Sequence, residues 1–370
     1  MPRLLTIKEA AGVMKVSRQT IYGWIKKGVL KPVRTPGGRL RIPEDQLIIT
    51  KLEPELVSIP GLFPIRDISD LAPEGPEQLG TKEKSWFAYS EKHWYWDFKG
   101  DRFLFKAGRE GTGENWAEKV ACELCKLLEL PHAEYDLAVY RGKKGVITPN
   151  FVPKGARLEL GNEILARYVS GYEKTKRFSQ TQHTLSRVLR WVRGKEVDLP
   201  IGFSGFDYLN SAIDVFVGYL MLDAWIANQD RHHENWGYVV ELSNGSIHLA
   251  PTFDHASSLG RNESDENRVR RLNTKDIGMS MERYIERAKS AFYQTQKDTK
   301  PLSTIDAFII AAKRRPDAAR IWLQKLEDIS SPDVRAIIVR VPHEEMSDIA
   351  KGFTQQILDL NRQRLLGIVL

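Results

Sequence analysis

Long hydrophobic segments are missing from this sequence. A membrane-spanning helix needs about 18 or more consecutive apolar residues, and no such run occurs. The first residues, MPRLLTIKEAAG, also lack the apolar core of a signal peptide. These absences favour a cytoplasmic protein with no membrane partner.

Cysteine is almost absent as well, with two in 370 residues. Cys122 and Cys125 are three residues apart in the apolar segment KVACELCKLLEL, a spacing that puts both side chains on one face of a helix. A lone pair of this kind lacks the second pair of ligands that a structural zinc site requires. We therefore expect both cysteines to be reduced core residues.

Beyond its first fifty residues, the chain has no excess of charge of either sign. The net charge is +7, and residues 1–50 hold ten lysines and arginines against three acidic residues, so the remainder is balanced. A local excess of positive charge is typical of a surface that meets a polyanion. The length of 370 residues also predicts more than one domain, because single cores stop growing at roughly 250–300 residues.

The basic segment contains the start and stop signals of two short helices. Thr6 and Glu9 form a capping box that opens a helix through Met14. Ser17 is a second N-cap, and the helix after it, over residues 18–27, ends at a glycine. Two short helices joined by a tight turn are typical of a helix-turn-helix.

Two extended runs follow, Leu30–Val33 and Arg39–Ile42, separated by a turn containing Pro-Gly-Gly. Residues 4–47 thus resemble the winged helix-turn-helix domains of MerR and excisionase type, in which the second helix enters the major groove and the wing reaches the backbone or minor groove. The resemblance implies that residues 1–50 bind DNA. The residues that would contact the duplex are Arg18, Gln19, Thr20, Tyr22, Arg39 and Arg41. The alternative is a basic module that docks on a protein.

The rest of the chain predicts a linker and a two-lobed enzyme. Residues 51–79 contain five prolines and no sustained periodicity, which indicates a linker, either free or partly packed. Residues 80–159 are rich in strand candidates and form a small lobe, whereas residues 160–370 are mainly helical. The fold class is therefore α+β, with the layout of protein kinases. The predicted elements of the small lobe are strands at Ser85–Tyr89, His93–Phe98, Arg102–Lys106, Ala138–Tyr140 and Gly145–Thr148, and a helix at Asn115–Leu128.

Two motifs in the helical part carry the chemistry. The first is NQDRHHEN, which follows an apolar helix at Ala212–Ala227; the second is FDHAS, on the far strand of a hairpin turning at an Asn-Gly pair. Phosphoryl transfer needs a carboxylate near the attacking hydroxyl, together with a carboxylate and an amide that hold Mg²⁺. Asp230, Asp254 and Asn235 supply that set.

These motifs, N-x-D-x-H-x-x-N followed by F-D-x-x-S, resemble those of the HipA-like kinases over about residues 80–370. The resemblance implies an ATP- and Mg²⁺-dependent serine/threonine protein kinase in which Asp230 is the catalytic base, His232 supports the loop, and Asn235 and Asp254 bind Mg²⁺. It also implies a protein substrate, autophosphorylation and an antitoxin-like partner, since members of the family are often toxins. The usual Asp-Phe-Gly is replaced here by Asp254-His255-Ala256.

The nucleotide side of the site is expected in the small lobe. Lys106 ends a strand, as a residue that holds the α- and β-phosphates should, and its orienting acid is either Glu118, favoured by the resemblance, or Glu123. The turn at residues 80–84, with Gly80, Lys82 and Lys84, would cover the phosphates. An ordinary charged turn is the alternative. Phe151 would stack near the adenine, or else be a core residue.

A polar stretch after the second motif could receive substrate. We expect a solvated loop here; the alternative is that its arginines, at positions 261, 268, 270 and 271, bind an acidic or phosphorylated group. Thr81 and Ser264 are candidate sites of autophosphorylation.

Three other functions fit parts of the pattern. The Asp-Arg-His form of the first motif occurs in phosphatidylinositol kinases, which act on lipids. The histidines and acids near positions 232–234 and 254–255 are also metal-ligand types, as in a metal-dependent hydrolase. A non-catalytic transcription regulator that uses a kinase fold as a ligand sensor is the third.

Overall fold

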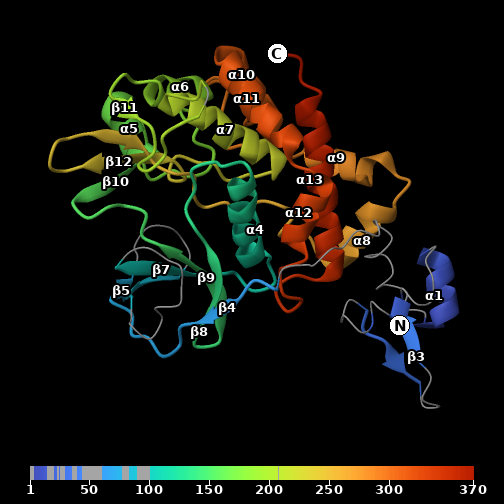
Figure 1. Ribbon diagram of the computed structural model, residues 1–370. Coiled ribbons are helices and arrows are strands. Elements are labelled where there is room, and N and C mark those ends of the chain that lie inside the picture. Colours follow the sequence, from blue (N-terminus) through green and yellow to red (C-terminus); the bar gives the residue numbers. More distant parts are fainter. Residues whose placement is uncertain are drawn as a thin grey trace. The chain divides into compact units, whose positions relative to one another are not determined.

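The computed structural model divides into two compact units, Met1–Pro60 and Gly61–Leu370, and each is described here by itself (Figure 1). The structure describes residues 4–14, 21–22, 25, 30–35, 40–43, 61–76, 83–89, 101–206 and 208–370. Within these ranges, no helix has both the length and the apolar character to cross a membrane.

The smaller unit is a three-stranded antiparallel sheet with one described helix, α1 (Ile7–Met14). Its strands, in the order β1-β3-β2, are β1 (Leu4–Leu5), β2 (Val33–Arg34) and β3 (Leu40–Pro43). The capping box is confirmed, because the Glu9 N–H donates to Thr6 Oγ1 at 3.1 Å and the Thr6 N–H donates to Glu9 Oε2 at 2.7 Å. The predicted wing strands pair with each other, and the core of the unit includes Ile21 from the second predicted helix. Most of that helix, with Ser17, lies outside the described residues.

The larger unit begins with a six-stranded sheet in the order β4-β8-β9-β7-β6-β5. Helix α4 (Glu114–Leu127) packs against β8 and β9. The strands are β4 (Ile65–Asp67), β5 (Gly75–Pro76), β6 (Lys84–Ala88), β7 (Arg102–Ala107), β8 (Asp136–Tyr140) and β9 (Lys143–Pro149). Strands β6, β7, β8 and β9 match predicted strands within a few residues, and the strand expected at His93–Phe98 lies outside the described residues.

The linker expected at residues 51–79 is wrong for residues 61–76. These residues supply both edge strands of the sheet, because β4 pairs with β8 and β5 pairs with β6. Phe63 and Ile68 are also buried in the core of the larger unit. The edge strands have two or three residues each, which is too short for an alternating pattern to show among the prolines.

A second, four-stranded sheet lies among the helices. Its strand order is β10-β12-β13-β11. The hairpin of β12 and β13 was predicted, with Gly245 at its turn (φ 75°), whereas β10 was not. The strands are β10 (Ala156–Leu160), β11 (Val197–Asp198), β12 (Gly237–Glu241) and β13 (Ile247–Leu249).

Helices make up the remainder of the larger unit. They are α5 (Gly161–Tyr168), α6 (Leu185–Val192), α7 (Ala212–Trp225), α8 (Asp265–Asn273), α9 (Met281–Glu286), α10 (Thr304–Arg314), α11 (Pro316–Asp328), α12 (Ser331–Ile338) and α13 (Asp348–Leu366), with a short 3-10 helix at Ile277–Met279. Every residue of α7 is buried, and α10, α11 and α13 pack around it. Figure 1 shows these helices on the side of the unit away from β4–β9.

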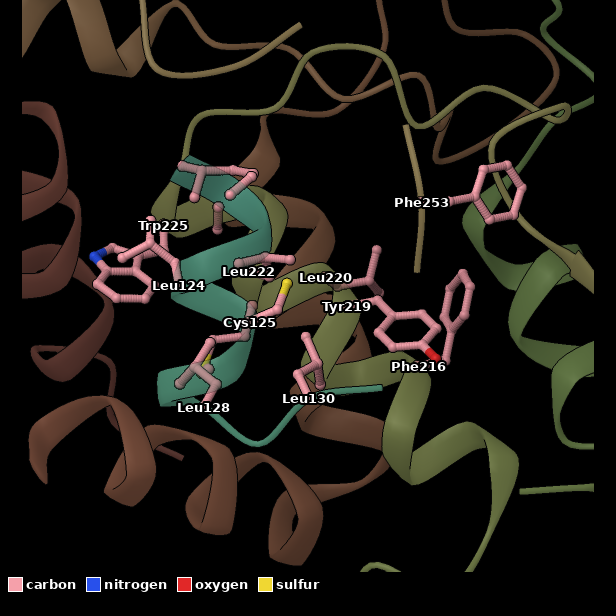
Figure 2. Close-up of a cluster of buried hydrophobic side chains, with 14 of the residues drawn as sticks. Leu124, Cys125, Leu128, Leu130, Phe216, Tyr219, Leu220, Leu222, Trp225 and Phe253 are labelled. Atoms are coloured by element: carbon pink, nitrogen blue, oxygen red, sulfur yellow. The ribbon is translucent and has the colours of Figure 1, made fainter. Parts of the chain in front are cut away.

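Helix α7 also meets α4, so the two lobes share one core. Figure 2 shows Leu124 and Cys125 of α4 in the same cluster as Leu222 and Trp225 of α7. Both cysteines are buried and free, as predicted. Burial raises the pKa of the Cys122 thiol far above its usual range, which keeps it protonated.

Candidate active site

The loop that follows α7 is anchored to that helix by a buried ion pair. Ala227 has a φ of 53°, a left-handed conformation that is uncommon for residues other than glycine, and it lies where the chain leaves the helix. Arg231, only 1% exposed, donates through Nε and Nη2 to the two carboxylate oxygens of Asp223, at 2.8 and 2.7 Å. Its Nη1 donates to the carbonyl of Asn235 at 2.8 Å. These contacts hold residues 228–235 against α7.

The four residues assigned to catalysis and metal binding all line one cavity of about 1290 Å³. Nδ2 of Asn235 donates to the carbonyl of Asp230 at 2.7 Å, and Nε2 of His232 lies 3.6 Å from Oδ1 of Asp230. Asp254 lies past the end of β13 rather than on that strand, and its φ of 59° is also left-handed. Backbone strain of this kind is concentrated at functional sites.

The environment of Asp230 suits a group that accepts a proton. Burial raises the pKa of this carboxyl, and the carboxylate of Asp254 acts in the same direction. His232, a hydrogen bond from Ser257 and the charge of Arg261 act against the rise. A carboxylate whose pKa is raised toward neutrality is a better general base than an exposed one.

Lys106 reaches the same cavity from β7. Its Nζ lies 3.7 Å from Oδ2 of Asp254 and donates to the hydroxyl of Tyr135 at 3.1 Å. That hydroxyl in turn accepts the N–H of Asp254 at 3.3 Å. Burial acts to lower the pKa of Lys106, but Asp254, Tyr135 and Glu118 outweigh it and raise the pKa, so the lysine stays charged. Sequence reasoning missed Tyr135, which belongs to none of the motifs.

Of the two candidate acids on α4, Glu118 faces the site and Glu123 does not. Oε1 of Glu118 accepts the N–H of His255 at 2.8 Å, whereas Glu123 pairs with Lys119 and Lys126. Lys106 forms its ion pair with Asp254 and not with Glu118. Glu118 instead contacts His255, the residue that follows Asp254 in the chain. Its position fixes the backbone of the second motif.

One side of the cavity, where the adenine of a nucleotide is expected, is apolar. The ring of Phe151 stacks on that of Phe253, with centroids 5.6 Å apart and an angle of 29° between the planes. Both rings line the cavity, together with Leu104 and Leu160, which fits a purine. Lys84 lines it as well. The other two residues assigned to the phosphate-covering turn, Gly80 and Lys82, lie outside the described residues.

Three of the four arginines after the second motif have partners within the chain. Arg261 pairs with Glu114, and the buried Arg268 donates to the carbonyl of Gly260 at 3.1 Å. Arg271 packs its guanidinium 4.8 Å from the ring centroid of Tyr284. Buried guanidinium groups need partners, and this chain supplies them internally. Of the four, only Arg270 is exposed.

The candidate sites of autophosphorylation differ in what the structure describes of them. Ser264 is exposed and caps α8, where its hydroxyl accepts the N–H of Asn267 at 3.3 Å. Thr81 lies outside the described residues.

The hydrolase alternative is not favoured by the histidines. His233 turns away from His232, with 81° between their rings, and its Nδ1 bonds the hydroxyl of Tyr172 at 2.7 Å. In the described part of the chain, one trio of His, Cys, Asp or Glu side chains is close enough to share an ion, and it contains Cys122, His132 and Glu134. None of the three lines the cavity.

Few of the DNA-contacting candidates can be placed. Tyr22 is exposed, and Nη1 of Arg41 donates to the carbonyl of Leu40 at 3.2 Å. The others, Arg18, Gln19, Thr20 and Arg39, lie outside the described residues.

Comparison with known proteins agrees with both parts of the architecture. Residues 4–48 match the model of a helix-turn-helix domain family. No curated protein matches the sequence. The structure is similar to that of CtkA, a proinflammatory kinase of Helicobacter pylori, with a TM-score of 0.62 and 20% identity over 83% of this chain and 100% of that one. At this identity the likeness establishes the kinase fold.

A second similar structure is HipA of Shewanella oneidensis MR-1, which was solved in a toxin–antitoxin complex with HipB and operator DNA. The TM-score is 0.49 and the identity 10%, over 92% of this chain and 74% of that one.

Proposed function

Since the larger unit has the fold of a kinase, we propose that this chain is a protein kinase that transfers the γ-phosphoryl group of ATP to a serine or threonine hydroxyl. The observation that carries the proposal is the convergence of Asp230, Asn235, Asp254 and Lys106 on one cavity. These residues come from three separate segments of the chain, and each has the chemistry that its position in phosphoryl transfer requires.

Asp230 would take the proton of the attacking hydroxyl. Its carboxylate lies at the cavity and is held from both sides by His232 and Ser257. The buried ammonium of Lys106 would bind the phosphates of ATP, and the ring of Phe151 would face the base. In this arrangement the protein supplies position and charge rather than a covalent intermediate.

Asn235 and Asp254 would hold Mg²⁺. Because Nδ2 of Asn235 donates to the carbonyl of Asp230, its amide oxygen is the atom left for a cation. Amide and carboxylate oxygens are the donors that Mg²⁺ takes, so the residues fit the ion. When bound, the ion would neutralise charge on the phosphates.

The test is transfer of radiolabelled phosphate from ATP·Mg²⁺ to protein, with Asp230→Asn as the inactive control. Generic protein substrates and the chain itself serve as acceptors. Phosphatidylinositol vesicles form a second arm, and labelling there alone would make the enzyme a lipid kinase. Binding of ATP without transfer to any acceptor would favour a ligand-sensing regulator.

We further propose that the smaller unit binds duplex DNA. The support is the match of residues 4–48 to a helix-turn-helix family and the concentration of positive charge in residues 1–50. A kinase joined to such a unit suits autoregulation of a toxin–antitoxin operon, with a protein substrate and an antitoxin-like partner. Co-purification of a second small protein encoded beside this chain would test the last point.

A further inference from the structure

Arg261 lies at the cavity but belongs to neither of the two motifs. Its side chain is nine-tenths buried and lines the cavity that holds Asp230. Nη1 pairs with Oε1 of Glu114, and Nη2 donates to Oγ of Ser257 at 3.0 Å. Its Nε is buried and makes no hydrogen bond to any described residue. A single guanidinium therefore contacts a helix of the small lobe and a loop of the large lobe.

The contact to Ser257 determines where the serine hydroxyl points. A guanidinium can only donate, so the oxygen of Ser257 accepts from Arg261. The single hydroxyl hydrogen is then left for another acceptor, which is Oδ2 of Asp230 at 3.3 Å. Since His232 lies 3.6 Å from Oδ1 of Asp230, both oxygens of that carboxylate have a neighbour that restrains them.

The other end of Arg261 is fixed by Glu114, the first residue of α4, which is 2% exposed. Glu114 also accepts the N–H of Arg109 at 3.1 Å and its Nη1 at 2.9 Å. A backbone hydrogen bond of 2.9 Å runs from Gly113 to the carbonyl of Arg261 beside this pair. The start of α4 is thus connected to Asp230 through the side chains of Glu114, Arg261 and Ser257. The same helix carries Glu118.

We propose that Arg261 is a positioning residue, which orients the carboxylate of Asp230 through Ser257 and fixes it relative to α4. This inference rests on the proposed kinase activity. It concerns the alignment of the base with the attacking hydroxyl, a property that changes the rate of transfer in the bound complex. Affinity for ATP is set by other residues, among them Lys106 and Phe151.

The test compares Arg261→Gln, Arg261→Lys, Ser257→Ala and the double variant Ser257→Ala/Arg261→Gln in steady-state kinetics on one protein acceptor. We expect kcat to fall by about 10- to 100-fold in Arg261→Gln and Ser257→Ala, with KM for ATP little changed. The double variant should be no slower than the slower single variant, because both changes break one chain of contacts. Arg261→Lys should be intermediate, since an ammonium keeps the charge but not the fork.

Arg320→Gln is the matched control, because Arg320 is an exposed arginine of α11 that forms an ion pair with the likewise exposed Asp317 and does not line the cavity. Thermal unfolding of every variant is measured alongside the kinetics. If Arg261→Gln does not fold, Ser257→Ala carries the test alone.

Three results would overturn the inference. An active wild type with unchanged kcat in Ser257→Ala and Arg261→Gln would remove the positioning role and leave the proposed function intact. A loss confined to the unfolding temperature or to KM, or strictly additive effects in the double variant, would make the contacts structural only. A wild type that transfers no phosphate to any acceptor would reject the kinase proposal itself, and this role with it.

Discussion

Replacing Arg231 by methionine should destabilise the larger unit and also slow transfer, and the two effects can be separated. Arg231 is 1% exposed and forms its ion pair with Asp223, whose side chain is 4% exposed. The change leaves a carboxylate buried without its cation, which costs about 3–5 kcal/mol of unfolding free energy. The carbonyl of Asn235 also loses its donor.

The double variant Asp223→Leu/Arg231→Met tests the origin of that cost. Replacing both members of a buried ion pair by apolar groups of similar volume is often close to neutral, so we expect it to recover most of the unfolding free energy. It should not recover transfer, because Asn235 and Asp230 have still lost the anchor of their loop. Stability would then return without activity.

The assay is urea unfolding followed by tryptophan fluorescence, with kcat measured on the same preparations. Trp24 is the only tryptophan of the smaller unit, so the signal reports mainly on the larger one. Arg283→Met is the control, because Arg283 forms an exposed pair with Glu286 and such pairs contribute about 0–1 kcal/mol. A loss below about 1 kcal/mol in Arg231→Met, equal to that of the control, would refute the anchoring role.

Three further predictions follow from other parts of the molecule. Phe63→Ala should lower the unfolding free energy by about 3–5 kcal/mol, because the ring is 3% exposed with Lys119 and Arg340 over it at 4.7 and 4.1 Å; a change near zero in urea unfolding would contradict this. Burial lowers the pKa of His183 to about 3, so the unfolded chain takes up this proton first as pH falls below about 6.5. The unfolding free energy should therefore decline between pH 7 and 5, and less so in His183→Gln; equal slopes for the two proteins would reject this cause. A chain lacking residues 1–60 should keep transfer activity and lose duplex binding, and binding by the full chain should weaken steeply with added salt; equal binding by the shortened chain would show that the smaller unit is not the DNA-binding part.

Much of the fold could be predicted because strong local signals agree with it. The capping box at Thr6 and Glu9, the wing hairpin and helix α4 follow from residue type and spacing. Residues 61–76 were missed because β4 and β5 are short and gain their stability from pairing with β8 and β6, which are distant in the sequence. Tertiary pairing of this kind leaves no periodic pattern.

The candidate site also has a part that the sequence predicted and a part that it did not. Asp230, Asn235 and Asp254 lie in two motifs, and the structure places them at one cavity. The surroundings of Lys106 were only partly predictable: Glu118 was expected to orient it, but the lysine contacts Asp254 and Tyr135, and Tyr135 is outside every motif. The burial of Arg261 could not be predicted for a similar reason, since Glu114 is far from it in sequence and a polar stretch suggests solvent exposure.

Phosphate transfer at this cavity is measured most directly as single-turnover transfer of radiolabelled phosphate from ATP·Mg²⁺ by the full chain. We predict transfer by the wild type, and a fall of at least about 10³-fold in both Asp230→Asn and Asp254→Asn, with unfolding temperatures that show both variants to be folded. Activity in Asp254→Asn equal to that of the wild type would contradict the assignment of this residue to Mg²⁺. Equal activity in both variants would contradict the site itself.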